Sequence, residues 1–316
     1  MNPKNLNRET GIPGLIKVCG LSFIVILLLV AGDFRFARAE HKDSEINKLV
    51  IGNDTDSINH SEVDMKSVRA AWDLLGSEML KKTGLKAEHF FYDDLNSLVK
   101  DFNNDKIDVI STSALNYLNI ADRIEEDFGF TTIVRGKATH QYLVLTRSNS
   151  DIAGITDLKD KKLIIKKEDK TGRFFLDATL LQNGLEEADK FFRSIAITRT
   201  FVQAILSTFF GKAEICIAPD TVFKTMIELN PQVGKRLRVV HSSPDIINSV
   251  FVFRKNYDEK AKKTAVREIM HMKDTSYGKQ LFMLYKIEDI VLLKESQLDT
   301  LKSFMNNYKE LKLKNK

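Results

Sequence analysis

The sequence contains little cysteine, proline or tryptophan. Its 316 residues include 2 cysteines, 5 prolines and 1 tryptophan. Cys19 lies in an N-terminal segment that we expect to be removed, so Cys216 would be the only thiol of the mature chain. An intrachain disulfide is thereby excluded. The apolar residues around Cys216 (213–218, AEICIA) are typical of a buried strand, which favours a packed thiol over a reactive one.

Short catalytic and metal-binding motifs are also missing. The sequence has no HExxH, no GxSxG and no Walker A stretch, and its histidines show no close pairing. We therefore expect no enzyme activity, no bound metal and no other cofactor. A catalytic site assembled from distant segments is the alternative that these absences leave open.

Long apolar runs are scarce, and the main one lies near the N-terminus. Residues 21–31 (LSFIVILLLVA) are apolar, but a membrane-spanning helix needs about 20 such residues. Lys4, Arg8 and Lys17 precede the run, and a small-x-small pattern ends at Ala39. These features predict a signal peptide over residues 1–39, cleavage after Ala39 and a periplasmic location. The alternative is an uncleaved anchor.

Excess charge is nearly absent from the remaining chain. The whole sequence has a net charge of +5, and residues 1–39 carry seven charged groups that sum to +3. The mature chain would thus have a net charge of +2. This balance argues against nucleic acid as a partner.

Short apolar strands alternate with amphipathic helices along the chain. This alternation is typical of an α/β fold with parallel strands and helices on both faces of the sheet. No internal repeat is visible. The pattern predicts strands at 48–52, 85–92, 107–110, 131–134, 141–146, 163–165, 213–218, 236–241 and 250–253, and helices from 257 onward.

The middle of the chain reads as a second α/β unit inserted into the first. We expect one lobe to comprise 45–148 and 245–316, and a second lobe to comprise 149–244. The chain would cross between the lobes twice, which implies a cleft and a two-strand hinge. Ligands of open α/β sheets bind beyond the carboxyl ends of strands, where helices begin.

The segment Lys161–Leu185 is the clearest candidate for such a place. A short apolar strand is followed by a polar loop and then by a helix, which Gly184 would end. Lys170, Thr171 and Gly172 would lie at the helix N-terminus, where unpaired N–H groups and the helix dipole attract anions. The alternative is a helix cap without a ligand, because the Asp169 carboxylate can satisfy the same donors.

Other polar residues fall at equivalent positions. Ser111, Thr112 and Ser113 follow a buried strand, Thr200 precedes an amphipathic helix, and Asp220 begins another. Together with the Lys161–Leu185 segment they predict a binding site for a small oxyanion or polar solute. For Asp220, an early-turn carboxylate that faces the helix dipole is the alternative.

Several framework motifs resemble those of the phosphate-, phosphite- and phosphonate-binding proteins of ABC transporters. Lys82-Thr83-Gly84-Leu85 is similar to a family motif at the end of the first helix. Asp108-Val109, the turn 158–161 (LKDK) and the late segment 271–278 (HMKDTSYG) also resemble family motifs. The resemblance covers nearly the whole mature chain and implies a two-lobed, type II periplasmic-binding-protein fold.

The ligand motifs of that family are only partly kept. Tyr117 matches the family's tyrosine, and His140 stands at an aromatic position before the hinge. Residues 169–172 (DKTG) replace a Ser-Thr-Ser-Gly loop, and Thr200 begins a segment that replaces Ser-His-Asp. The strand ends and helix starts, taken together with the resemblance, predict one ligand site. Its residues are Ser111, Thr112, Ser113, Tyr117, His140, Lys170, Thr171, Gly172, Thr200 and Asp220.

The resemblance implies an exported, monomeric protein that captures a small solute of the phosphate, phosphite or phosphonate class. It would deliver that solute to an ABC permease. Because several ligand-site positions differ, a periplasmic sensory module that signals to a membrane-bound partner is the alternative.

Overall fold

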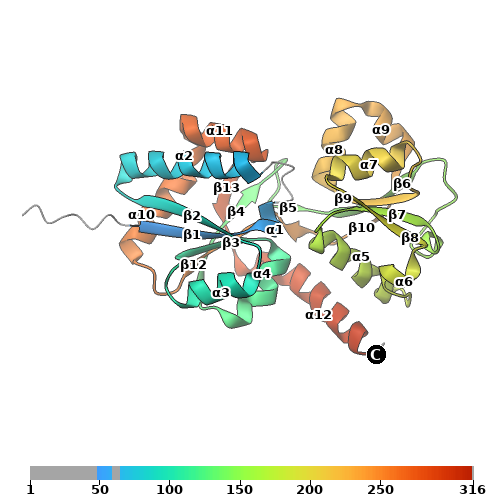
Figure 1. Cartoon of the computed structure of the whole chain (residues 1–316), viewed down its shortest axis with the longest axis horizontal. Coiled ribbons are helices and arrows are strands. Elements are labelled where there is room, and N and C mark those ends of the chain that lie inside the picture. Colours follow the sequence, from blue (N-terminus) through green and yellow to red (C-terminus); the bar gives the residue numbers. More distant parts are fainter. Residues whose placement is uncertain (1–47, 59–64, 315–316) are drawn as a thin grey trace, which may run out of the picture. The chain divides into compact units, whose positions relative to one another are not determined.

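The computed structural model describes residues 48–58 and 65–314, which form two mixed β-sheets flanked by helices (Figure 1). The predicted signal peptide, its cleavage site after Ala39 and residues 45–47 of the predicted first lobe lie outside the described residues. None of the helices in the described part of the chain combines the length and the apolar character that spanning a bilayer requires.

The first sheet has six strands. The strands β1, β2 and β3 are parallel, and β12, β4 and β13 continue the sheet in antiparallel pairings. Most of β1 is buried, as expected for a parallel strand covered on both faces. In spatial order the strands are β13 (Asp289–Leu292), β4 (Glu126–Ile133), β12 (Val250–Arg254), β3 (Val109–Thr112), β1 (Lys48–Asp54) and β2 (Lys86–Tyr92).

The second sheet has five strands. The strands β8, β7 and β9 are parallel neighbours, and β6 and β10 complete the sheet in antiparallel pairings. Strand β9 is buried throughout and contains the thiol of Cys216. In spatial order the strands are β10 (Leu237–Ser242), β6 (Tyr142–Arg147), β9 (Ile215–Pro219), β7 (Lys162–Lys166) and β8 (Ser194–Thr198).

A short two-stranded ladder joins the two chain segments that pass between the sheets. Strand β5 (Thr139–His140) leads from β4 into β6, and β11 (Ile246–Ile247) leads from β10 back into β12. The two pair antiparallel, His140 with Ile246 and Thr139 with Ile247. Strand β6 belongs to the second sheet, although the sequence analysis placed residues up to 148 in the first lobe.

Helices cover both faces of the first sheet, with α2 and α11 on one face and α3 and α4 on the other (Figure 1). Side-chain caps begin several of them; Asp94, for example, accepts hydrogen bonds from the amides of Asn96 and Ser97 at the start of α3. The helices of this part are α1 (Thr55–Ile58), α2 (Met65–Thr83), α3 (Leu95–Asn103), α4 (Ala114–Ile120), α10 (Glu259–Met270) and α11 (Ser276–Tyr285).

The second sheet is covered in the same way, with α5 and α6 on one face and α7, α8 and α9 on the other (Figure 1). Its helices are α5 (Lys170–Gln182), α6 (Ala188–Phe191), α7 (Phe201–Phe209), α8 (Asp220–Leu229) and α9 (Pro231–Arg236). The remaining short 3-10 turns are η2 (Ala121–Arg123), η3 (Thr156–Leu158), η4 (Met272–Asp274) and η5 (Glu295–Leu298).

The C-terminal helix α12 (Asp299–Lys314) packs against α5 beside the second sheet. Phe174 of α5 meets Phe304 and Tyr308 edge to face, with ring centroids 5.7 and 5.2 Å apart. The hydroxyl of Tyr308 donates to Glu187 at 3.0 Å. The sequence analysis assigned residues 245–316 to the first lobe. Helix α12, which lies within this range, nevertheless borders the second sheet.

Most predicted elements occur, but one prediction was wrong and one strand was placed too late. The chain after Tyr257 is not entirely helical, because β13 pairs with the edge of β4. The strand expected at 131–134 begins earlier, at Glu126. In both places the pairing with a distant strand decides the local structure, and that pairing leaves no mark in local periodicity. Gly84 and Gly184 do follow helix ends with positive φ, as predicted.

A close helix–strand contact makes Gly76 of α2 sensitive to substitution. A Cβ added there would lie 2.5 Å from the backbone oxygen of Ala87 in β2. Gly76→Ala should therefore lower the free energy of unfolding by about 1–3 kcal/mol, because overpacking outweighs the gain of about 1 kcal/mol in helix propensity. Gly154, whose Cβ would meet nothing within 4 Å, supplies the control Gly154→Ala. Urea unfolding measures both variants, and equal stability of the two would contradict the packing argument.

Candidate functional site

Polar side chains gather where β1 and β3 end. Asp54 is the last residue of β1, and Thr112 is the last residue of β3. Because the two strands are parallel neighbours, their carboxyl ends meet at the same edge of the sheet. Helices α1 and α4 begin directly beyond this edge.

The buried carboxylate of Asp54 forms the centre of this group. Its side chain accepts hydrogen bonds from the Thr112 hydroxyl at 2.7 Å, the Asn116 amide at 2.6 Å and the backbone N–H of Asp56 at 3.1 Å. Burial raises the pKa of Asp54 above its ordinary value, and the hydrogen bonds from Asn116 and Thr112 oppose that rise. The result is a carboxyl that takes up a proton more readily than an exposed one.

An ion pair joins this edge of the first sheet to the second. The ammonium of Lys170, in the first turn of α5, contacts the Asp56 carboxylate. The Asn116 amide lies 3.4 Å from the same carboxylate. The hydrogen bond with Asp56 raises the pKa of Lys170, while partial burial opposes the rise. The Lys170 side chain is 56% exposed.

The N-terminus of α5 is capped by its own chain. Asp169 accepts hydrogen bonds from the Gly172 N–H at 3.0 Å and from the Tyr142 hydroxyl at 2.8 Å. A Cβ on Gly172 would lie 2.1 Å from the Asp169 carboxylate and 2.8 Å from the Tyr142 ring. The glycine thus admits the capping carboxylate, and Thr171 beside it is buried. The cap by Asp169 that the sequence allowed for is thus present, and contact of this segment with a solute stays a prediction.

Three other predicted residues also accept hydrogen bonds from the protein itself at helix starts. The Ser113 hydroxyl accepts from the Asn116 N–H at 3.2 Å at the start of α4, and the Thr200 hydroxyl accepts from Gln203 at 3.1 Å. Asp220 accepts from the Gln141 N–H at 3.0 Å and from Lys224 at 2.6 Å. These contacts leave the role of the three residues toward a solute as a prediction.

Tyr117, His140 and Ser111 are not among the hydrogen-bond partners of Asp54. The buried Tyr117 hydroxyl donates to Glu126 at 2.7 Å, and burial raises its pKa. His140 lies 3.1 Å from the Asn248 side chain, and both His140 and Ser111 line a cavity beneath the first sheet. Of the ten predicted residues, Thr112, Ser113 and Lys170 therefore belong to one connected polar network.

Sequence reasoning missed Asp54, Asp56, Asn116 and Tyr142. The first two follow the first strand within a stretch that was read only as a polar loop. Their position at a strand end was a usable signal, because that is where ligands of α/β sheets bind. Asn116 and Tyr142 carry no such signal, since their partners lie 62 and 27 residues away in the sequence.

Within residues 48–58 and 65–314, no group of three or more His, Cys, Asp or Glu side chains is placed to hold a metal ion.

The chain matches one family of known proteins. The family model, described as "ABC transporter, phosphonate, periplasmic substrate-binding protein", matches residues 60–298. A search of curated proteins gives no significant match.

Solved structures share the fold at low sequence identity. A binding protein component of an ABC phosphonate transporter from Pseudomonas aeruginosa has a TM-score of 0.64 and 14% identity, over 86% of this chain and 90% of its own. A Xanthomonas citri protein bound to ATP has a TM-score of 0.62 and 12% identity, over 84% and 98%. A Prochlorococcus marinus protein in complex with methylphosphonate has a TM-score of 0.61 and 14% identity, over 82% and 97%. The predicted type II fold is confirmed.

The raised pKa of Asp54 predicts a pH-dependent stability. Between the ordinary pKa, 3.8, and the higher pKa in the folded protein, the native state binds more protons than the unfolded state. Protonation of Asp54 therefore stabilises the fold at low pH, and this contribution is lost as pH rises through that window. Asp54→Asn has no carboxyl to protonate and so lacks this stabilisation at low pH. The free energy of unfolding of Asp54→Asn, minus that of wild type, should therefore rise with pH and become constant above the folded-state pKa of Asp54.

Asp94 provides a control of opposite sign. Hydrogen bonds from the Ser97 and Asn96 amides at the start of α3 hold its pKa below the ordinary value. Asp94→Asn should therefore lose stability relative to wild type as pH rises. Urea unfolding across a pH series tests both variants, and a pH-independent difference for Asp54→Asn would refute the burial argument.

Proposed function

Because the chain belongs to the family of periplasmic substrate-binding proteins of phosphonate ABC transporters, we propose that it captures a small oxyanion-bearing solute for an ABC permease. The solute is of the phosphate, phosphite or phosphonate class. The observation that carries the proposal is the family match over residues 60–298, joined to the polar group at the ends of β1 and β3. The periplasmic sensory module is not favoured, because the family is a transport component.

Lys170 is the cation that receives the solute. Its ammonium already pairs with a carboxylate, Asp56, at a place where both sheets present helix starts. We infer that Asp56 stands in for the solute in the unliganded protein, and that the arriving oxyanion displaces it. Charge-assisted hydrogen bonds are roughly twice as strong as neutral ones, so Lys170 contributes more to the affinity than a neutral donor would.

The remaining predicted site residues stay part of the proposal. The Thr112 hydroxyl and the Asn116 amide are donors that could turn from Asp54 toward the solute. Protonation of Asp54, whose pKa is raised, lowers the repulsion that a nearby anion would meet. The full proposed set is Ser111, Thr112, Ser113, Tyr117, His140, Lys170, Thr171, Gly172, Thr200 and Asp220, with Asn116 added.

The two sheets act as two lobes in this proposal. The first lobe holds the six-stranded sheet, and the second holds the five-stranded sheet from β6 to β10. The paired crossovers β5 and β11 are the hinge, because the chain passes between the sheets there twice. Bending at such short segments lets lobes close on a ligand and exclude water.

Export, monomeric state and lack of catalytic activity complete the proposal. The family is periplasmic, which agrees with the signal peptide expected over residues 1–39. A receptor that hands its solute to a permease needs neither a catalytic group nor nucleic acid as a partner.

Two substitutions separate the roles of Lys170 and Asp56. Lys170→Ala should weaken binding of methylphosphonate or phosphate by about 1.5–3 kcal/mol, the value of a hydrogen bond to a charged group. Asp56→Asn should strengthen it by up to about 1 kcal/mol, because the competing ion pair is removed. Calorimetry measures both, with the exposed Lys190→Ala of α6 as the control. Unchanged affinity in both variants would place the oxyanion elsewhere.

Closure of the lobes gives a separate test. Saturation with the tightest solute in that calorimetric series should lower the radius of gyration seen by small-angle scattering. Lys170→Ala, measured at the same solute concentration, should show a smaller change because fewer molecules are occupied. An unchanged radius at saturation would argue against hinge closure.

A further inference from the structure

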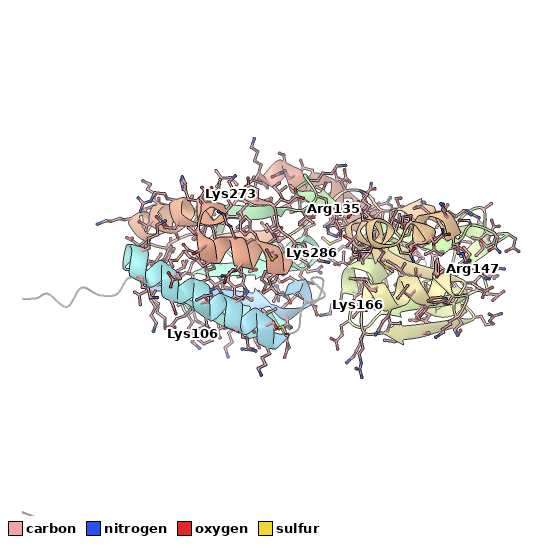
Figure 2. All side chains as sticks on the ribbon, turned by 90° about the horizontal axis from the view of Figure 1, so that it is seen from above. Lys106, Arg135, Arg147, Lys166, Lys273 and Lys286 are labelled. Atoms are coloured by element: carbon pink, nitrogen blue, oxygen red, sulfur yellow. The ribbon has the colours of Figure 1, made fainter. Side chains whose placement is uncertain are left out.

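A cavity of about 370 Å³ lies between the six-stranded sheet and helices α2, α10 and α11. Its walls are mainly apolar, with Met79 and Leu281 from the helices and Phe130 and Phe253 from the strands. Figure 2 shows α2 and α11 side by side over this layer, with Lys286 just beyond the end of α11. Pockets that bind small molecules typically measure roughly 300–1,000 Å³ and have mostly apolar walls with a few polar groups.

Three buried polar atoms in the cavity wall lack hydrogen-bond partners among the described residues. They are the indole nitrogen of Trp72, Nε2 of His89 and the hydroxyl of Tyr285. The Trp72 ring stacks on His89 with centroids 4.5 Å apart and lies 6.0 Å from the Tyr285 ring. Unpaired buried polar groups are rare in native proteins, and three neighbours in one wall call for an explanation.

All three atoms are hydrogen-bond donors. The Trp72 indole and the Tyr285 hydroxyl can donate in their ordinary forms. His89 Nδ1 lies 3.4 Å from the Asn53 side-chain nitrogen, which also contacts the carbonyl oxygens of Ile51 and Phe90. Because that nitrogen can only donate, Nδ1 accepts, and the proton of the neutral ring is on Nε2. The wall therefore offers donors and needs an acceptor.

The three donors are also uncharged near neutral pH. Burial lowers the pKa of His89 to about 4, so its imidazole is neutral. Burial raises the pKa of Tyr285, and the nearby Trp72 indole only partly opposes this rise. Beside these three donors an ionised ligand group would lose its hydration without gaining an opposite charge, which is costly. Arg135 and Lys286 also line the cavity, but Arg135 pairs with Glu228 and Lys286 is exposed. A neutral acceptor meets no such penalty.

We propose that this cavity binds an uncharged, largely apolar carbonyl compound, whose oxygen accepts hydrogen bonds from the Trp72, His89 and Tyr285 group. Its hydrocarbon part lies against the apolar wall that includes Met79 and Leu281. The carbonyl relieves the cost of unpaired buried donors, and the hydrocarbon part replaces water against apolar surface. The cavity continues to His140 and to Thr221 of α8, which give it a polar end.

The Trp72, His89 and Tyr285 group is separate from Lys170, which does not line the cavity. Ser111 and His140 of the proposed oxyanion set do line the cavity, so the two proposed sites share part of one wall. A solute of the phosphonate class would meet the Lys170 ammonium, whereas a carbonyl compound would meet the three uncharged donors.

The test uses three eight-carbon probes: 2-octanone, 1-octene and octanoate. Trp72 is the chain's one tryptophan, so its fluorescence reports contact at the cavity wall. The carbonyl oxygen of 2-octanone can accept hydrogen bonds from the wall donors, whereas 1-octene cannot. We therefore expect 2-octanone to bind about 2- to 12-fold more tightly than 1-octene for each hydrogen bond that its carbonyl accepts. Octanoate should bind less tightly than 2-octanone at neutral pH.

Variants on one helix isolate the hydrogen bond. Tyr285→Phe removes only an unpaired hydroxyl, and it should weaken 2-octanone by about 2- to 12-fold and leave 1-octene unchanged. Tyr277→Phe on the same helix, which does not line the cavity, should change neither probe. Leu281→Phe should weaken both probes by filling the cavity, and Lys170→Ala should affect neither.

Two results would overturn the proposal. One is absence of binding by both 2-octanone and 1-octene. The other is equal affinity for the two probes together with no effect of Tyr285→Phe, which would mean that water satisfies the three donors.

Discussion

Helices that begin at strand ends leave backbone N–H groups without intrahelical acceptors, and much of this structure follows from how those groups are satisfied. Asp169 does so for α5, Ser113 for α4 and Thr200 for α7. In α/β binding proteins the same groups are available to anions. Here the chain supplies its own acceptors, so a solute must compete with side chains already in place.

The pairing of Asp56 with Lys170 extends this competition across the two sheets. An internal ion pair keeps the cationic side chain near the place where a solute would meet it, and so less side-chain entropy is lost on binding. Under the proposed function the pair would also set a threshold, because a weakly charged solute would not displace the carboxylate. Affinity and selectivity would then depend on the same contact. The packing of α12 against α5 adds a second restraint on the sheets, beyond the paired crossovers β5 and β11.

The sequence predicts elements well where the signal is local. Gly84 and Gly184 mark helix ends because positive φ strongly favours glycine, and the strand ahead of Thr171 is recognisable from its apolar run. The strand β13 was not predicted, because this short segment becomes a strand only through its pairing with β4. The hydrogen bond that Asp169 accepts from Tyr142 could not be predicted, because this partner lies 27 residues away and no local pattern indicates it.

The burial of Cys216 has a practical consequence. Its thiol is fully enclosed in β9, and burial raises its pKa to about 12, so the thiolate that alkylating reagents attack is essentially absent at neutral pH. It is also the one free thiol within the described residues. Maleimide dyes or spin labels attached to cysteines introduced on the surface of each sheet's helices would therefore report from the chosen positions, against a silent background from the native thiol.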